Sequence, residues 1–554
     1  MGDVSSRKLR VAVIGGGLSG LSAAYELGKN PLLHVDLFEK SDHLGGIVTT
    51  TEKDGFLFEL GPQSMNSKHD EVEEIIRDLG LVSNKVFRSG GKSVKTLIIR
   101  DGKPVELKLS PSGFFSSKLL SFRAKLFLFL EPFKRKSKST DLSIDEFSAH
   151  RFGRETTDYL VDPMMSGVNG GSLRTLSAKY ALPTAWIAEQ TKGSVILGML
   201  GAKKKHPRKY PSKLLRETMS FEQGLKVLPD TLAEKSKAFI HKKREVKRLC
   251  LQEDGRWDVG HWSPYDAVIS TAPTYSLQQI STCRNTRLRE LLSDLSTLSY
   301  SAISILFLGF KDVTSRIPLT GFGCLAPTRE SRSFLGMTFT TSSFEGRTPE
   351  GGIGVNVFLG GGHNPKQARF SQDEAVAMAR HELHELFGIE KAPQTVAYRQ
   401  WLRAIPQYEL GYEHYESSLN AAEEEFPGLF FAGNYRDGIG VPDAIRSGVI
   451  AAKRVNKFQE PAERCTKVEI VMFICERERP SRCLLRSSEL WSRGTLCLGY
   501  LGSLSGNSSR RILLLVVQHI LGILLATRML PVSLPSALVL GVQSLSAHEP
   551  VWPC

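Results

Sequence analysis

The apolar positions near the start of the chain form two short runs on either side of a longer periodic segment. Residues 11–14 are Val, Ile and Ala and end at glycines, residues 18–27 are apolar at helical spacing, and a second apolar run occupies 34–38. Short β-branched runs that stop at glycine are typical of buried strands, and the longer segment is typical of a helix. The pattern predicts a strand, a helix and a second strand.

Similar patterns continue along the chain. Asp-Gly pairs at 54–55 and 101–102 lie between alternating apolar stretches, which predicts two β-hairpins. An amphipathic helix is predicted over 372–386, and another helix is predicted to begin near Gln223. Further strands are predicted at 257–259, 266–272, 299–310, 321–326, 353–359 and 429–433. Strands that alternate with helices in this way predict an α/β fold.

The glycines after the first strand have the spacing of a dinucleotide-binding loop. Gly15 permits a tight turn, Gly17 lets the backbone approach a pyrophosphate, and Gly20 lets the next helix pack against the strand. The phosphates then lie at a helix N-terminus, where free N–H groups favour negative charge. Glu39 follows the second strand, where its carboxylate can accept hydrogen bonds from both ribose hydroxyls and would repel a 2′-phosphate. The loop predicts a bound adenine dinucleotide other than NADP.

A second glycine-rich segment lies near residue 440. The strand predicted at 429–433 is followed by Gly438 and Gly440, and then by a helix whose small residues permit close packing. Here the sequence resembles the flavin-containing amine oxidase superfamily, in which this strand and helix lie against the isoalloxazine ring. The His43–Gly46 stretch resembles that family's R-x-G-G, with His43 in the arginine position. The resemblance implies FAD, and the absence of a cysteine near Asn434 predicts that it is bound non-covalently.

Three further segments, at 147–172, 321–323 and 405–411, narrow the resemblance to the porphyrinogen-oxidising members of this superfamily. It implies an α/β fold with a discontinuous Rossmann-like FAD-binding domain, an α+β substrate domain and a helical membrane-binding domain. The implied boundaries are 8–88, 219–296 and 405–457 for the FAD-binding segments, 89–218 for the helical membrane-binding and substrate region, and 297–404 for the substrate domain. The likeness ends near residue 457 and implies no structure for the tail, 458–554.

The resemblance also implies site residues, position by position. Tetrapyrrole contacts are implied at Gly167, Leu335 and Phe358. Thr96 stands where animal members carry an arginine that faces a substrate propionate, so the adjacent Lys95 is expected to neutralise that carboxylate, without a bidentate fork. No catalytic base and no metal are implied. FAD contacts are implied at Gly15, Gly16, Gly17, Leu18, Ser19, Gly20, Glu39, Lys40, Ile47, Gly61, Pro62, Gln63, Ser64, Val246, Asn434, Ile439, Gly440 and Val441.

The activity implied by the resemblance is the oxidation of protoporphyrinogen IX to protoporphyrin IX in haem biosynthesis. Six electrons leave the substrate in three flavin cycles, and dioxygen is reduced to hydrogen peroxide. The implied place is the intermembrane-space side of the mitochondrial inner membrane, and the resemblance leaves open whether the chain forms a homodimer. Two alternatives remain: a flavin oxidase or desaturase that acts on an amine or polyene, and a catalytically silent FAD-bound scaffold.

Charge and one apolar segment bear on the partners. A formal charge of +14 on 554 residues suits an anionic membrane surface or an acidic substrate, and nucleic acid is disfavoured because no recognition motif is present. An apolar stretch from Phe114 to Leu130 precedes Pro132 and the basic run 134–138. It is too short to span a bilayer, so the sequence predicts a helix lying on an anionic lipid surface. The alternative is a core helix beside a solvated basic loop.

The cysteines and the tail offer less. Cys250, Cys283 and Cys324 stand isolated in the body of the chain, and no C-x-x-C occurs, so neither a zinc site nor a redox dithiol is predicted. The apolar run 512–525 in the tail is marginal as a membrane span. The tail is either an anchor or an end without a fold, and the second interpretation is favoured.

Overall fold

The computed structural model describes residues 8–87, 95–108, 113, 116–201, 209–211, 217–260, 264–311, 321–362 and 364–458. Some of the sequence predictions fall outside these residues. They concern Phe114 and Phe115 of the apolar stretch and the tail from 459 onward.

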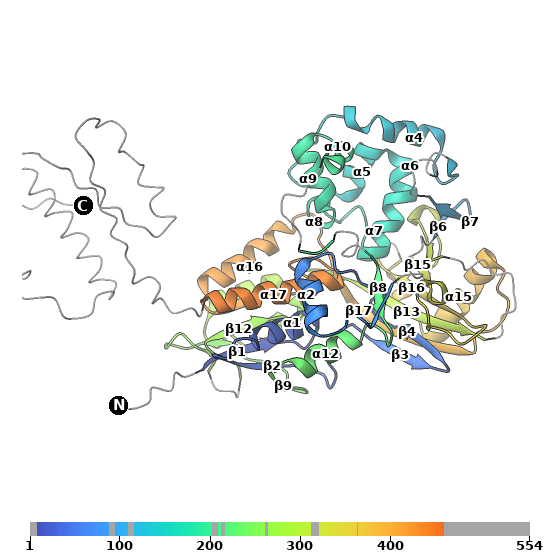
Figure 1. Ribbon diagram of the computed structural model, residues 1–554. Helices are drawn as coiled ribbons and strands as arrows, with labels where there is room; N and C mark the ends of the chain where they lie inside the picture. Colours follow the sequence, from blue (N-terminus) through green and yellow to red (C-terminus); the bar gives the residue numbers. More distant parts are fainter. Residues whose placement is uncertain are drawn as a thin grey trace, which may run out of the picture. The chain divides into compact units, whose positions relative to one another are not determined.

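A parallel five-stranded sheet is built from distant parts of the chain (Figure 1). Val11 of the first strand is in register with Val35 on one side and with Ala267 on the other, and every strand pair in this sheet is parallel. The sheet confirms a Rossmann-like α/β fold assembled discontinuously. Its strands, in spatial order, are β18 (Leu429–Phe431), β12 (Ala267–Ser270), β1 (Leu9–Ile14), β2 (Leu33–Phe38) and β9 (Phe239–His241).

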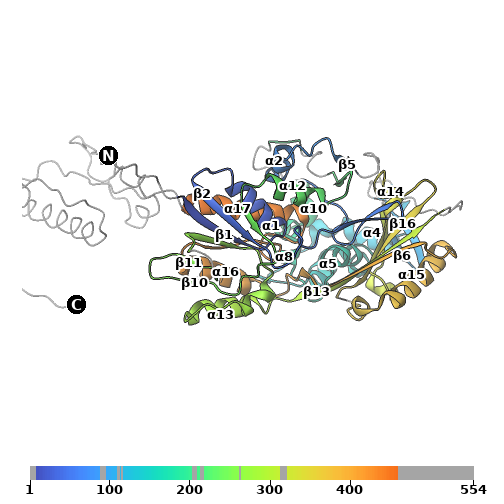
Figure 2. The same ribbon diagram turned by 90° about the horizontal axis from the view of Figure 1, so that it is seen from below.

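Alternate residues of these strands face two separate cores, as expected for a buried sheet. Val11 and Val13 pack with α1 (Leu18–Leu27), α2 (Asp70–Asp78), α12 (Val227–Lys235) and α17 (Val441–Phe458). Ala12 and Ile14 pack on the opposite side, and Figure 2 shows the two sets of helices on the two faces. The elements of the second face are β10 (Cys250–Leu251), β11 (Trp257–Asp258), α13 (Thr286–Leu295) and α16 (Glu413–Glu425).

The small residues of α17 allow it to lie directly against α1. A Cβ on Gly448 would come within 2.1 Å of the Ser19 carbonyl oxygen, so a larger residue has no room there. The Ser19 hydroxyl also donates to the Ala444 carbonyl at 2.8 Å. The two helices predicted from the two glycine-rich segments therefore pack together and bring those segments close.

A second sheet has seven strands in the order β17-β13-β16-β15-β14-β6-β7, antiparallel except between β14 and β6. Helix α15 (Gln372–Phe387) covers one face, and β3 (Thr50–Lys53) and β4 (Phe56–Glu59) form a hairpin whose phenylalanines pack against the other. The predicted strands at 299–310, 321–326 and 353–359 and both predicted hairpins are confirmed. The strands are β6 (Thr96–Arg100), β7 (Lys103–Leu107), β13 (Tyr300–Phe310), β14 (Gly323–Leu325), β15 (Gly336–Phe339), β16 (Ile353–Gly360) and β17 (Thr395–Pro406).

Residues 116–201 form a set of short helices that we call the helical lobe (Figure 1). Ser143 begins one of them with a capping box closed by Glu146. Among the described residues, none of the helices has the length and apolar character needed to cross a bilayer. Its elements include α4 (Phe122–Phe129), the 3₁₀ turn η2 (Glu131–Phe133), α5 (Ile144–Phe152), α6 (Arg154–Thr156), α7 (Asp162–Asn169), α9 (Pro183–Lys192) and α10 (Val195–Leu200).

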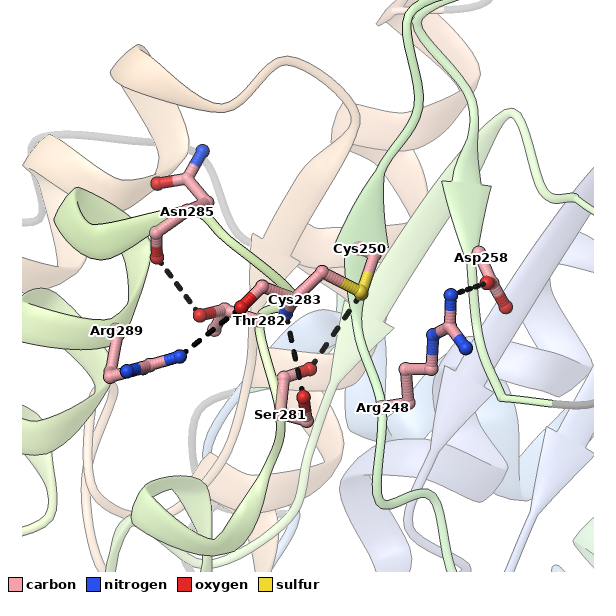
Figure 3. Close-up of a disulfide and its surroundings, with 8 residues drawn as sticks. All are labelled: Arg248, Cys250, Asp258, Ser281, Thr282, Cys283, Asn285 and Arg289. Atoms are coloured by element: carbon pink, nitrogen blue, oxygen red, sulfur yellow. Dashed lines mark hydrogen bonds and ion pairs between the residues drawn. A yellow bond between two sulfur atoms is a disulfide. The ribbon is translucent and has the colours of Figure 1, made fainter.

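Cys250 and Cys283 form a disulfide, which corrects the interpretation of both as isolated cysteines (Figure 3). They are separated by 33 residues, and the fold brings β10 beside the segment that carries Cys283. Two backbone hydrogen bonds hold the segments together, from Leu249 N to Ser281 O and from Ser281 N to Lys247 O, each 2.8 Å. Spacing alone gave no sign of this pairing, because it depends on tertiary structure.

We expect the double substitution Cys250→Ser/Cys283→Ser to lower the free energy of unfolding by about 2–4 kcal/mol, because the open loop regains conformational entropy in the unfolded chain. Denaturant unfolding with and without a reductant measures this. The wild-type protein should lose the same amount on reduction, and the double variant should not respond. Equal midpoints for oxidised and reduced wild-type protein would contradict the prediction.

Candidate functional site

Two glycines of the loop after β1 are in close contact with other protein atoms, and a third borders open space. Gly15 has φ +106°, and a Cβ there would lie 2.6 Å from the Thr271 hydroxyl. A Cβ on Gly20 would lie 1.8 Å from the Gly15 carbonyl oxygen, so the start of α1 requires glycine. A Cβ on Gly17 would meet nothing within 4 Å. The open space is therefore at the N-terminus of α1, where the phosphates were predicted.

Glu39 lies at the carboxyl end of β2, beside this loop. Its Oε2 accepts a hydrogen bond from Gly16 N at 2.7 Å, and its Oε1 accepts from Ser41 N and Oγ at 2.8 and 2.7 Å. The neighbouring Lys40 is exposed, and Val246 is half-buried beside the second core of the sheet. The carboxylate is held at the edge where a ribose was predicted, and its contact with a ribose stays a prediction.

The segments around Ile47 and Gly61 are packed against each other and against the glycine loop. Gly45 N donates to Gly16 O at 2.8 Å, and a Cβ on Gly61 would lie 1.9 Å from Ile47 O. Pro62 and Ser64 are half-buried, as is Gln63, whose Nε2 donates to the Gly61 carbonyl at 2.9 Å. The structure thus brings three of the predicted cofactor segments together.

The last predicted segment, 434–441, is fixed by a tyrosine and an aspartate. The Tyr408 hydroxyl accepts a hydrogen bond from Gly438 N at 2.9 Å and donates to Asn434 O at 2.6 Å. Asp443 accepts from Gly440 N at 3.2 Å. Ile439 and Val441 are half-buried, and α17 begins at Val441. Because β1 and β18 are parallel, the helices that follow them begin at the same edge of the sheet, where α/β proteins bind ligands.

Asp443 also contacts Lys68 and His69, the two residues that precede α2. Lys68 Nζ lies 2.8 Å from one carboxylate oxygen, and His69 Nε2 lies 2.9 Å from the other. Burial alone would raise the pKa of Asp443, but the hydrogen bonds from His69 and Lys68 lower it below its ordinary value. The sequence analysis missed these three residues, since nothing local marks a contact between positions so far apart.

Glu59 and Arg347 form a second buried charged region. Glu59 Oε1 accepts from Leu225 N at 2.8 Å and Oε2 accepts from the Thr50 hydroxyl at 2.7 Å. Burial raises the pKa of Glu59 to about 7, against the effect of these hydrogen bonds and of the nearby Arg347. Burial also lowers the pKa of Arg347. The sequence analysis did not identify Arg347.

Three of the four predicted substrate residues lie at one face of the second sheet. Leu335 N donates to Phe358 O at 2.8 Å, and both side chains join the apolar cluster on the face opposite to α15. Gly167 on α7 approaches the same face, since its Cβ would lie 3.2 Å from Leu325 Cδ2. Lys95 is placed differently: it is exposed, and its Nζ lies 3.8 Å from Glu106 Oε2. The structure brings the apolar contacts together and leaves Lys95 in a surface ion pair.

A parallel sheet with two glycine-rich segments at one edge is typical of dinucleotide-binding proteins. Here it is joined to a second sheet and a helical lobe, which carry the predicted substrate contacts. Residues 18–456 match the family described as flavin containing amine oxidoreductase. The chain belongs to this family and is a flavin-dependent oxidoreductase.

Among its relatives, the chain is 32% identical to protoporphyrinogen oxidase 2, chloroplastic/mitochondrial, of Arabidopsis thaliana, over 81% of this chain and 94% of that protein. It is 26% identical to coproporphyrinogen III oxidase of Bacillus subtilis, over 81% and 98%. The fold is similar to the crystal structure of a protein from Exiguobacterium titled a putative protoporphyrinogen oxidase, with a TM-score of 0.68, 23% identity and coverage of 82% and 100%.

Proposed function

We propose that the protein binds FAD non-covalently and oxidises protoporphyrinogen IX to protoporphyrin IX in haem biosynthesis. The observation that carries the proposal is the 32% identity to a relative of that name over 94% of its length. The apolar cluster around Leu335 and Phe358 supports it, because a porphyrinogen presents a large apolar macrocycle.

The described residues fit FAD. The space beside Gly17 can take a pyrophosphate, and the Glu39 carboxylate lies at the end of β2, where it can accept ribose hydroxyls. The sequence has no cysteine between 429 and 458, the stretch that follows the closing strand, which supports non-covalent binding. The alternative of a catalytically silent FAD-bound scaffold shares all of these features, and only an activity assay separates it from an enzyme.

When bound, FAD accepts two electrons in each cycle, so removing six hydrogens takes three cycles and reduces three dioxygen molecules to three hydrogen peroxide molecules. The residues of this chain bind and orient the substrate. Leu335 and Phe358 pack against the macrocycle, and the apolar cluster around them excludes water from the reacting carbons. We assign no general base.

The test is the appearance of protoporphyrin fluorescence when oxygen is admitted to the purified yellow protein mixed anaerobically with protoporphyrinogen IX. We expect one molecule of protoporphyrin IX, measured by its fluorescence, for every three molecules of hydrogen peroxide. Coproporphyrinogen III is the second substrate to test, because the Bacillus subtilis relative carries that name. Flavin reduction by an amine or polyene, with no reaction of either porphyrinogen, would establish the rival oxidase; a flavin that no substrate reduces would establish the scaffold.

We also propose that the helical lobe binds an anionic membrane surface. Large apolar side chains are exposed on it: Phe122 is 81% exposed and Phe133 is 82% exposed, and Leu200 on α10 is 81% exposed. Arg135 and Lys138 are exposed beside Phe133. Exposed apolar groups next to basic ones suit the interface of an anionic bilayer. This supports the membrane interpretation of the 114–138 segment over a buried core helix.

Lys134 has a different part from the other basic residues. Its Nζ donates to the carbonyl oxygens of His150 and Arg151 at 2.8 and 3.0 Å, and it lies 3.1 Å from the centre of the Phe127 ring. Burial and the nearby Arg151 lower the pKa of Lys134. It is a structural residue of the lobe, so a test of lipid binding must leave it intact.

We expect Arg135→Gln/Lys138→Gln to weaken flotation with anionic vesicles, because each basic residue near such a surface contributes about 1 kcal/mol. Added salt should weaken flotation of the wild-type protein, since exposed charges are screened beyond about 8 Å at physiological ionic strength. Phe122→Ser/Phe133→Ser should reduce binding at every salt concentration. Lys247→Gln, an exposed lysine outside the lobe, is the matched control. Unchanged flotation of both double variants would show that the segment is an ordinary solvated surface.

For location we propose the intermembrane-space side of the mitochondrial inner membrane. The name of the Arabidopsis relative includes a mitochondrial form. The Cys250–Cys283 disulfide supports an oxidising compartment, since disulfides are rare where thiols are kept reduced.

A further inference from the structure

A small cavity lies between β4, β15 and the segment that carries α14 (Thr340–Ser343). Its volume is about 20 Å³, which is room for one small polar group. Both apolar and polar side chains form its wall. The lining includes Phe58, Gln63, Phe322, Thr338, Thr340 and Arg347.

Arg347 brings an unpartnered donor to this cavity. The residue is only 3% exposed, and its Nη2 donates to Ser220 Oγ and to Phe221 O, each at 2.8 Å. Its Nη1 is buried and has no hydrogen-bond partner within the described ranges, and the same holds for Thr340 Oγ1. Leaving a buried charged donor unpaired is costly, so such groups normally have a partner. Two unpaired polar atoms, one on a guanidinium, suit the oxygens of an anion.

Glu59 lines the same cavity but is not the hydrogen-bond partner of Arg347 Nη1. Each of its carboxylate oxygens accepts a hydrogen bond, one from Leu225 N and the other from the Thr50 hydroxyl, and it acts on Arg347 through its charge. The burial that raises the pKa of Glu59 to about 7 also reduces its negative charge near neutrality. Arg347 therefore keeps positive charge available for another group.

The strand register places this cavity beside the predicted tetrapyrrole contacts. Thr338 lies opposite Asn356 and Gly336 lies opposite Phe358, on neighbouring strands. Residues two apart on a strand point to the same face and are separated by about 7 Å along it. The cavity, bordered by Thr338, is thus one such step from Phe358 on the same face. Thr96, where the arginine is missing, belongs to the same cross-strand row through Gly323.

We propose that this cavity receives a carboxylate of the substrate, with Arg347 Nη1 as its ionic partner and the Thr340 hydroxyl as a second donor. The inference rests on the proposed function, because porphyrinogens carry propionates. It also offers a partner for a carboxylate where Thr96 replaces the arginine, since Lys95 is exposed at the surface and lies 3.8 Å from Glu106. A guanidinium can meet a carboxylate with two parallel hydrogen bonds, which a lysine cannot do.

The test compares protoporphyrinogen IX with its dimethyl ester, using the FAD-loaded protein. We expect wild-type kcat/KM to favour the diacid by roughly tenfold or more, the factor that one charge-assisted hydrogen bond supplies. Arg347→Gln should remove this preference, mainly through KM for the diacid, with a much smaller effect on the ester. Thr340→Val, which keeps the shape and removes an unpaired hydroxyl, should lower the preference severalfold without lowering the melting temperature.

Arg332→Gln is the matched control, because Arg332 pairs with Glu382 of α15, the helix that covers the other face of the sheet. It should leave the preference for the diacid unchanged. Flavin content and melting temperature of each variant show whether Arg347→Gln has merely lost its fold, in which case Thr340→Val decides. Equal wild-type turnover of diacid and ester would overturn the inference and leave the proposed function standing. Turnover of neither would overturn both.

Discussion

Gly17→Val is expected to abolish flavin binding while the protein without its cofactor stays folded. Gly17 has φ −74° and ψ −179°, which is extended backbone that valine adopts readily. A Cβ there meets no protein atom within 4 Å, so the side chain fits the unliganded loop. It would then fill the space beside the N-terminus of α1 that a pyrophosphate needs. Flavin absorbance after purification, together with the melting temperature of flavin-free protein, measures the two parts of this expectation.

Gly20→Ala provides the contrast. A Cβ at Gly20 would lie 1.8 Å from the Gly15 carbonyl oxygen, so even one methyl group forces the turn apart. This variant should lower the stability of the flavin-free protein as well as flavin binding, whereas Gly17→Val should lower binding alone. A stoichiometric yellow Gly17→Val protein would show that the nucleotide loop is misplaced. Equal destabilisation by both substitutions would show that the space at Gly17 is not a ligand site.

The elements that the sequence predicted well are those in which one local pattern decides. Helix α1 runs over the predicted range 18–27, and α15 runs from Gln372 to Phe387, one residue beyond its predicted end. Strand β15 was not predicted, because four residues that begin with glycine carry no measurable alternation and form a strand only by pairing on both sides. Strand β17 was not predicted either, because it is an edge strand whose polar residues interrupt the alternation of apolar and polar positions.

The candidate site divides in the same way. The glycine loop and Glu39 could be predicted because their spacing follows from how a dinucleotide meets a strand and a helix. Arg347 could not, because its role depends on a cavity between segments that lie far apart in the sequence. Lys134 was expected to face lipid because it stands in a basic run, but its Nζ is held by two backbone carbonyls of α5. The sequence shows which residues are charged, but only the packed structure shows which of them are exposed and can contact lipid.

The helical lobe is organised around one buried arginine. Arg151 is fully buried, as are the two carboxylates it meets, Glu131 at 2.6 Å and Glu189 at 3.5 Å. Glu131 also accepts from Val195 N at 2.9 Å at the start of α10, where a negative charge is favoured. Arg151 Nη1 donates further to the carbonyl of Arg135 at 3.2 Å. One guanidinium therefore joins α5 to η2 and α9 directly and to α10 through Glu131. Of these elements, η2 and α10 carry the exposed Phe133 and Leu200.

Arg151→Met should therefore destabilise the lobe by about 3–5 kcal/mol, since it leaves buried carboxylates without their partner. Arg154→Met is the matched control three residues later: Arg154 is half exposed, and its ion pairs with Asp145 and Asp158 should be worth about 1 kcal/mol or less. Adding Glu131→Gln to Arg151→Met should recover part of the loss, because it removes one unpaired charge. Hydrogen exchange should rise in residues 131–200 while the separate core of the parallel sheet keeps its protection and its flavin. If Arg151→Met unfolds within 1 kcal/mol of Arg154→Met, the buried ion pairs do not hold the lobe together.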